Sequence, residues 1–171
     1  MHDVIDILTN LRGKTVWNGM GGPVHGPALG LELGGMRERK VPLTNPWISE
    51  ELRRFEGEYA LFITCAWRLA LNDRIVCGSL SRNEPDGDIV TAVAKLTGKT
   101  IVDVEVNREF LDFTLRFGDA QLAVFCDEVD AHEGRDNYHV TLQDSLVIVG
   151  CGSVVRSEPR TFDFRPPLRS V

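Results

Sequence analysis

The chain has 171 residues, of which 43% are hydrophobic and 26% are charged, and this balance is typical of an ordinary globular domain. It excludes a collagen-like, coiled-coil, disordered or disulfide-scaffold protein. The formal net charge of −6 repels phosphate backbones and anionic membrane surfaces, so we expect neither nucleic acid nor a membrane as a partner. The start of the chain lacks the basic and apolar regions of a signal peptide, and the longest apolar run, residues 59–71, is too short to span a bilayer. We therefore expect a cytoplasmic protein.

Residues 3–16 match residues 88–101 at a constant offset of 85, with identical Asp, Leu, Gly, Lys and Thr residues at matching positions. In both segments the apolar residues recur at the spacing of one helical face. Asp3 or Asp88 stands where each helix would start, and a glycine follows the last apolar residue of both. Each half of the chain is thus predicted to open with a short amphipathic helix.

Two further matches favour an internal repeat. Gly30–Gly35 aligns with Thr114–Asp119 at an offset of 84, and Cys77-Gly-Ser-Leu aligns with Cys151-Gly-Ser-Val at an offset of 74. The change of offset predicts an insertion of about ten residues in the first half. A helix-start pattern followed by an apolar stripe places this inserted helix near 46–56.

The second half shows the strands most clearly. Residues 100–106 alternate between valine and acidic side chains, which is typical of a half-buried strand. Two pairs of apolar segments flank short turn sequences and predict hairpins, 111–117 with 120–126 and 138–142 with 146–151. Because no long helices separate these strands, their pairing should be antiparallel.

These elements predict an α+β fold that is predominantly antiparallel β. We expect two pseudo-repeated helix-plus-five-strand units that form a sandwich or a barrel. The units span about 3–80 and 88–154 within a single domain, 1–155, and residues 156–171 are expected to form an extended tail.

The segment 59–71 is apolar at nearly every position, so we predict a single central strand buried on both faces. Arg68 interrupts its small, apolar face and would have to be satisfied by a buried carboxylate or by an anionic ligand. We expect the carboxylate. Trp67 precedes it and is a second candidate binding residue.

The segment 19–35 is rich in glycine and contains His25, the best-placed titratable group for function, although a long surface loop also explains the composition. The two Gly-Lys-Thr sequences lack the spacing of a phosphate-binding loop. The acidic segment 127–136 does not match a calcium-binding pattern; it is a solvated loop or a docking patch for a basic partner.

The four cysteines have no metal-ligand spacing and lie in apolar segments, so we expect reduced, buried thiols and no metal or cofactor. They are Cys65, Cys77, Cys126 and Cys151.

Over about residues 59–150 the chain resembles a group of small, functionally uncharacterised bacterial proteins. Some similar domains are encoded near contact-dependent or polymorphic toxins, so the resemblance implies an immunity-like role. The segments that carry it are Cys65-Ala-Trp-Arg-Leu, Cys77-Gly-Ser, Leu96-Thr-Gly-Lys, Leu115-Arg-Phe-Gly-Asp and Gln121-Leu-Ala-Val-Phe.

We therefore hypothesise a non-enzymatic cytoplasmic binding or interaction protein, whose partner is a protein or a small anionic ligand. The candidate binding residues are His25, Arg68 and Trp67. The alternative is an enzyme that acts on a small anionic metabolite, with His25 as acid or base and Arg68 as the anion clamp. Convergence of His25 and Arg68 on one concave pocket would favour the enzyme.

Overall fold

The computed structural model describes residues 3–160 except 24, 47 and 129–135, and in this part of the chain every strand pairing is antiparallel. The fold is β-rich with few helices, as predicted. In chain order the elements are α1 (Val4–Thr9), β1 (Val16–Gly22), β2 (Gly26–Glu38), α2 (Glu50–Arg54), β3 (Phe55–Ile63), β4 (Ala66–Leu71), β5 (Arg74–Gly78), α3 (Asp88–Ala94), β6 (Asp103–Val106), β7 (Phe113–Arg116), β8 (Ala120–Phe125), β9 (Tyr138–Thr141), β10 (Ser145–Val149), the 3-10 turn η2 (Cys151–Ser153) and β11 (Val155–Pro159).

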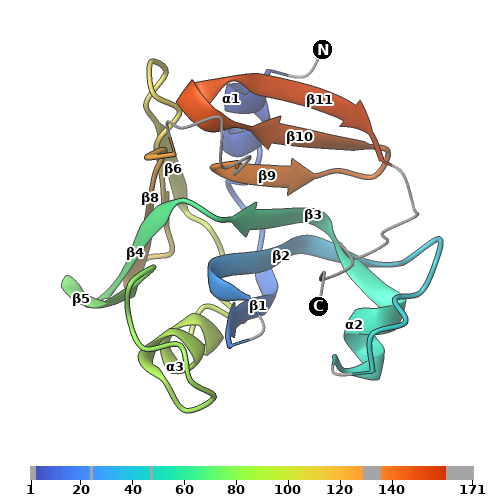
Figure 1. The fold of residues 1–171 in the computed structure, drawn as a ribbon, viewed down its shortest axis with the longest axis horizontal. Coiled ribbons are helices and arrows are strands. Elements are labelled where there is room, and N and C mark those ends of the chain that lie inside the picture. Colours follow the sequence, from blue (N-terminus) through green and yellow to red (C-terminus); the bar gives the residue numbers. More distant parts are fainter. Residues whose placement is uncertain (1–2, 24, 47, 129–135, 161–171) are drawn as a thin grey trace, which may run out of the picture.

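The strands form two sheets that lie at an angle to each other (Figure 1). The six-stranded sheet has the order β1-β2-β3-β9-β10-β11, and the five-stranded sheet has the order β5-β4-β8-β7-β6. Buried side chains from both sheets and from the helices α1 and α3 form one hydrophobic cluster. The core therefore lies between the sheets and is shared by them.

Both predicted opening helices are present. The Asp3 side chain accepts a hydrogen bond from the Ile5 backbone N–H at the start of α1, which is the expected cap. In the second helix Asp88 is instead the first helical residue and Gly87 occupies the cap position without a side-chain bond. The predicted glycine caps are wrong: α1 and α3 end at Asn10 and Lys95, both in the right-handed conformation. Gly13 and Gly98 lie three residues further on and adopt positive φ values of 81° and 85° in the turn that follows each helix.

The helix predicted near 46–56 is present as α2. Ser49 accepts a hydrogen bond from the Leu52 backbone N–H and so caps its start. No residue of α2 is buried, because the helix lies on the surface beside β3 (Figure 1).

The prediction of one strand over 59–71 is wrong. The chain leaves the six-stranded sheet after β3 and enters the five-stranded sheet at β4, with the turn at Thr64 and Cys65. Both of these residues donate their backbone N–H to the Asn137 carbonyl at 2.9 Å, which satisfies the bend. The apolar alternation runs on through the bend because both strands face the shared core. β3 and β4 are each interior strands of their own sheet.

The boundary at residue 155 also differs from expectation. Val155–Pro159 pairs along its whole length with β10, so strand pairing continues to Pro159. Residues 161–171, the remainder of the expected tail, lie outside the described residues.

The two chain halves meet in a reciprocal set of backbone hydrogen bonds. Thr15 and Thr100 form a β-bridge, and their hydroxyls are 2.7 Å apart. Each backbone bond around this bridge has a counterpart of equal length at an offset of 85: Gly13 N–H to Ile101 O and Gly98 N–H to Val16 O at 2.7 Å, Val16 N–H to Lys99 O and Ile101 N–H to Lys14 O at 2.9 Å.

The two Cys-Gly-Ser segments, in contrast, do not occupy matching places in the structure. Cys77 lies on β5 opposite Leu69, whereas Cys151 begins the turn η2 after β10. Identical short sequences therefore occupy unlike surroundings at this offset.

Candidate functional site

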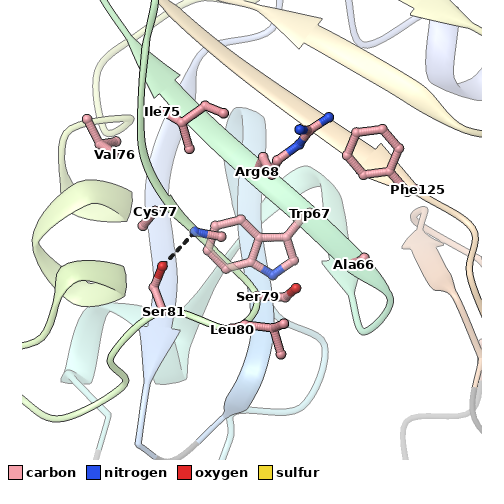
Figure 2. A pocket seen from close by; sticks show the side chains of 11 residues that line it. Ala66, Trp67, Arg68, Ile75, Val76, Cys77, Ser79, Leu80, Ser81 and Phe125 are labelled. Carbon is pink, nitrogen blue, oxygen red and sulfur yellow. Dashed lines mark hydrogen bonds between the residues drawn. The ribbon is translucent and has the colours of Figure 1, made fainter.

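An open groove of about 540 Å³ lies where β4, β5 and β8 meet on the five-stranded sheet (Figure 2). Its lining is mostly apolar, with a single charged side chain. The lining residues are Ala66, Trp67, Arg68, Ile75, Val76, Cys77, Gly78, Ser79, Leu80, Ser81 and Phe125.

Arg68 lies on the outer face of β4 and is exposed, which corrects the expectation of a buried guanidinium. The alternation along β4 turns Trp67 and Leu69 into the core and Arg68 away from it. Its guanidinium lies 4.7 Å from the centre of the Phe125 ring, a cation–π contact, and the two side chains stand side by side in Figure 2. Within the described residues it forms no ion pair with a carboxylate.

Trp67 is the buried inner wall of the groove, with 1% of its surface exposed. Its indole N–H donates a 2.8 Å hydrogen bond to the Pro27 carbonyl. This bond ties β4 to the start of β2. Trp67 therefore holds the groove in place from behind and offers little surface to a ligand.

The rim of the groove carries uncovered apolar side chains. Leu80 is 99% exposed and Ile75 is 65% exposed. Gly78 lies directly opposite Arg68 in the strand pairing, and a Cβ there would lie 2.7 Å from the Trp67 carbonyl oxygen, so the close backbone approach requires glycine. Clusters of exposed apolar groups rimmed by polar atoms are typical of contact surfaces.

The groove borders β5, an edge strand of the five-stranded sheet. β11 carries Arg156, Glu158 and Pro159, and β6 carries Asp103 and Glu105, which are the usual devices against edge pairing. α3 packs against β1 and also contacts β5. β5 itself carries one charge, at its first residue, and a bulge at Val76, where its pairing with β4 shifts register. It still presents exposed Ile75 and Val76.

His25 lies elsewhere. It sits in the turn between β1 and β2, and its ring packs edge-on against Phe62 at 6.3 Å. The other side of this cluster is His139, whose ring stacks on Phe62 at 5.2 Å. Burial lowers the pKa of both imidazoles, and Asp136 opposes this shift at His139. Neither histidine lines the groove, so the structure brings Arg68 and Trp67 together without His25.

A buried ionic cluster on the six-stranded sheet escaped the sequence analysis. Its carboxylates are 3% and 6% exposed as whole residues, and each is paired with arginine. Its members are Glu32, Glu56, Arg37, Arg39 and Arg160. Glu32, an acidic residue within the apolar run of β2, is the only sign of this cluster in the local sequence. The pairing of Glu56 with Arg160 joins residues 104 positions apart, so no local pattern reveals it.

The two carboxylates of this cluster differ in their electrostatics. Burial raises the pKa of Glu32, although the Gly57 N–H and Arg39 oppose the shift. Burial also acts to raise the pKa of Glu56, but Arg160, Arg39 and Arg37 outweigh it and hold that pKa below its ordinary value. The charges satisfy one another, so we assign the cluster a structural role.

The cysteine prediction is right for two residues and wrong for two. Cys65 and Cys77 are buried, whereas Cys126 and Cys151 are partly exposed, and all four are free thiols. A hydrogen bond with Cys126, together with burial, raises the pKa of Cys65, and burial raises the pKa of Cys77 to about 11. Neither buried thiol is therefore activated as a nucleophile.

No cluster of three or more metal-ligating side chains occurs among the described residues. Most of the acidic segment 127–136 lies outside the described part of the chain. No helix within that part is both long and apolar enough to cross a membrane. No protein-family model, curated protein or solved structure matches the chain.

Proposed function

We propose that this is a non-enzymatic cytoplasmic binding protein that takes up a segment of a protein partner in the groove of Arg68 and Leu80. The observation that carries the proposal is the combination of an exposed apolar rim with an exposed arginine that has no carboxylate partner among the described residues. Apolar contacts supply affinity, and one charge fixes orientation.

A protein segment suits this groove better than a small anionic ligand. A small-ligand site usually encloses most of its ligand, whereas this groove is open along an edge strand. Leu80 and Ile75 are exposed, and a partner would have to extend past the Arg68 guanidinium to cover them. An immunity-like role, in which the partner is a toxin polypeptide, is one form of such binding.

The enzyme alternative gains no support from the geometry. It requires His25 as acid or base beside Arg68, but His25 packs on Phe62 of β3 and Arg68 packs on Phe125 of β8. We therefore propose no reaction.

We also propose that the domain consists of two pseudo-repeated helix-plus-five-strand units that pack as a sandwich. The reciprocal hydrogen bonds around Thr15 and Thr100 support this proposal. So does the register of the opening hairpins: Asn18↔Glu32, Gly19↔Leu31 and Met20↔Gly30 correspond to Asp103↔Arg116, Val104↔Leu115 and Glu105↔Thr114. Thr15→Val and Thr100→Val are then expected to lower the free energy of unfolding by similar amounts.

Selection from a phage-displayed library of random twelve-residue peptides tests the binding function. We expect enriched peptides that bind the wild type and lose about tenfold or more in affinity to Leu80→Lys and Arg68→Glu. Val102→Lys is the matched control, because Val102 is 56% exposed on the opposite side of the sheet order, next to β6. Thermal melts establish that the variants are folded; Arg68→Ala should change stability by less than about 1 kcal/mol, since only an exposed cation–π contact is lost.

The proposal fails if the selection on the wild type enriches no peptide that prefers it to Leu80→Lys and Arg68→Glu. It also fails if the enriched peptides bind those variants as tightly as the wild type.

A further inference from the structure

We propose that the partner segment binds as an extended strand antiparallel to β5, and so adds a sixth strand to the five-stranded sheet. We further infer that this strand places an acidic side chain opposite Gly78, next to Arg68. This inference rests on the proposed function and specifies the class of partner for the same groove.

The first argument is a comparison of the two sheets. The five-stranded sheet has the order β6-β7-β8-β4-β5, which corresponds strand for strand to β1-β2-β3-β9-β10 of the six-stranded sheet. The six-stranded sheet has one further strand, β11, beside β10. The cross-strand rows agree in register. The outer-face rows are Gly78–Arg68–Ala123–Thr114–Glu105 and Ile148–His139–Phe62–Gly30–Met20.

In this comparison Gly78 corresponds to Ile148. Ile148 pairs on its far side with Arg156 of β11, whereas no strand among the described residues pairs with the far side of Gly78. The chain thus covers one of the two equivalent edges with an antiparallel strand of its own. The same kind of segment, supplied by another protein, is what the β5 edge fits.

The second argument is the state of the hydrogen-bonding groups at that edge. The Ser79 N–H donates to the Trp67 carbonyl across the β4–β5 pair, so the neighbouring Gly78 groups point away from β4. The Gly78 N–H donates to Ser81 Oγ at 2.9 Å (Figure 2). The Gly78 carbonyl accepts from the Ser81 N–H, also at 2.9 Å. A single residue of the following turn therefore satisfies both groups. An incoming strand would replace these contacts with equivalent backbone bonds.

The third argument concerns the side chains of the incoming strand. Its residue opposite Gly78 lies beside Arg68, because Gly78 and Arg68 face each other and line the same groove. An acidic group there meets a guanidinium whose present contact is the Phe125 ring. Residues two positions away on the same strand lie on the same face, where apolar side chains contact Ile75 and Leu80.

N-methylation of a bound peptide tests strand pairing directly. The probe is a peptide enriched in the library selection, made unmodified and in two forms that carry N-methyl groups on the alternate amides of one edge or the other. Because only one edge of a strand faces β5, we expect one form to lose about tenfold or more in affinity and the other to lose less than about twofold. In the same titration of isotope-labelled protein, the Gly78 amide should become more strongly protected from hydrogen exchange.

Two substitutions test the details. Ser81→Ala removes the side-chain acceptor that competes for the Gly78 N–H, so it should raise peptide affinity, whereas Ser79→Ala is the matched control. Replacement of the acidic residue of the peptide by its amide should weaken binding to the wild type and have little effect on binding to Arg68→Gln.

If both N-methylated forms bind like the unmodified peptide, or both lose equally, strand addition is wrong although the groove still binds. If no peptide depends on the groove, the proposed function fails as well. A dimer of the protein that the peptide dissociates, seen by sedimentation, would show that a second copy of this chain occupies β5 and would overturn the choice of partner.

Discussion

Glu56 shows how a single buried charge can control local stability. Its carboxylate bonds to Arg160 and Arg39 and to the Nε of Arg37, and its side chain is only 8% exposed. A carboxylate in this position is stabilising only as long as its partners remain, because isolated buried charges are costly.

Glu56→Gln should therefore lower the free energy of unfolding by about 3 kcal/mol, since it leaves partly buried guanidinium groups without a counter-charge. Urea denaturation measures the change. Glu38→Gln is the control: the Glu38–Arg54 pair is exposed at both side chains, so its loss should cost less than about 1 kcal/mol. Equal effects of the two substitutions would contradict the structural role of the cluster.

His25 and His139 predict a loss of stability in weak acid. Their pKa values are lowered in the folded protein, so the unfolded chain binds protons first as the pH falls below about 6.5. The two histidines should therefore make their full contribution to the free energy of unfolding above pH 6.5, and this contribution should decrease toward pH 5.

The measurement is denaturant unfolding at several pH values, compared with the double variant His25→Gln and His139→Gln. Glu32 acts in the opposite direction, because its pKa is raised, so the histidine contribution is the difference between the two proteins. A pH dependence that is unchanged in the double variant would rule out this assignment.

At the scale of the element, the β2–β3 pair depends on a close backbone approach. The register shifts between Leu33 and Met36, and Gly57 of β3 lies opposite this irregularity. A Cβ at Gly57 would lie 2.6 Å from the Leu33 nitrogen and 2.7 Å from the Leu33 carbonyl oxygen. These are backbone atoms, which cannot move aside without disturbing the strand pair.

Gly57→Ala should for this reason destabilise the protein by about 2 kcal/mol or more. Gly35→Ala is a control within the same bulge, because a Cβ there meets no atom within 4 Å and needs no positive φ. Gly35→Ala should be neutral or slightly stabilising, as it reduces the freedom of the unfolded chain. Thermal melts of the two variants distinguish close approach from a general requirement for glycine in this bulge.

At the scale of the whole molecule, the exchange of strands between the chain halves joins the two sheets into one unit. β9 from the second half pairs with β3, and β4 from the first half pairs with β8. Neither sheet is complete without strands from both halves, and the two share one core.

We therefore expect a single unfolding transition. Leu29→Ala in one sheet and Leu69→Ala in the other, both at positions with no exposed surface, should each cost about 2–5 kcal/mol and shift the same transition. Far-UV circular dichroism and tryptophan fluorescence should give coincident curves. Separate transitions for the two probes would show that the sheets unfold independently.

The sequence by itself determined the elements whose causes are local. The helices α1, α2 and α3, the hairpins β7–β8 and β9–β10, and the antiparallel β-rich class follow from apolar periodicity, helix caps and turn residues within a few positions of one another. Such signals need no knowledge of the rest of the chain. Trp67 in the core is also explained by this alternation.

Only the tertiary structure decided which face of each strand meets solvent and which distant segments meet. The apolar run 59–71 is compatible with one strand buried on both faces and also with two strands that face a shared core. Arg68 would be buried in the first arrangement and is exposed in the second, and the sequence pattern does not distinguish them. Contacts between residues far apart in the chain decide the pairing of Glu56 with Arg160 and the separation of His25 from Arg68. They also decide that β5 ends its sheet with no further strand beside it among the described residues. Periodicity reports the burial of a residue relative to its neighbours in sequence, whereas these features depend on what packs against it in space.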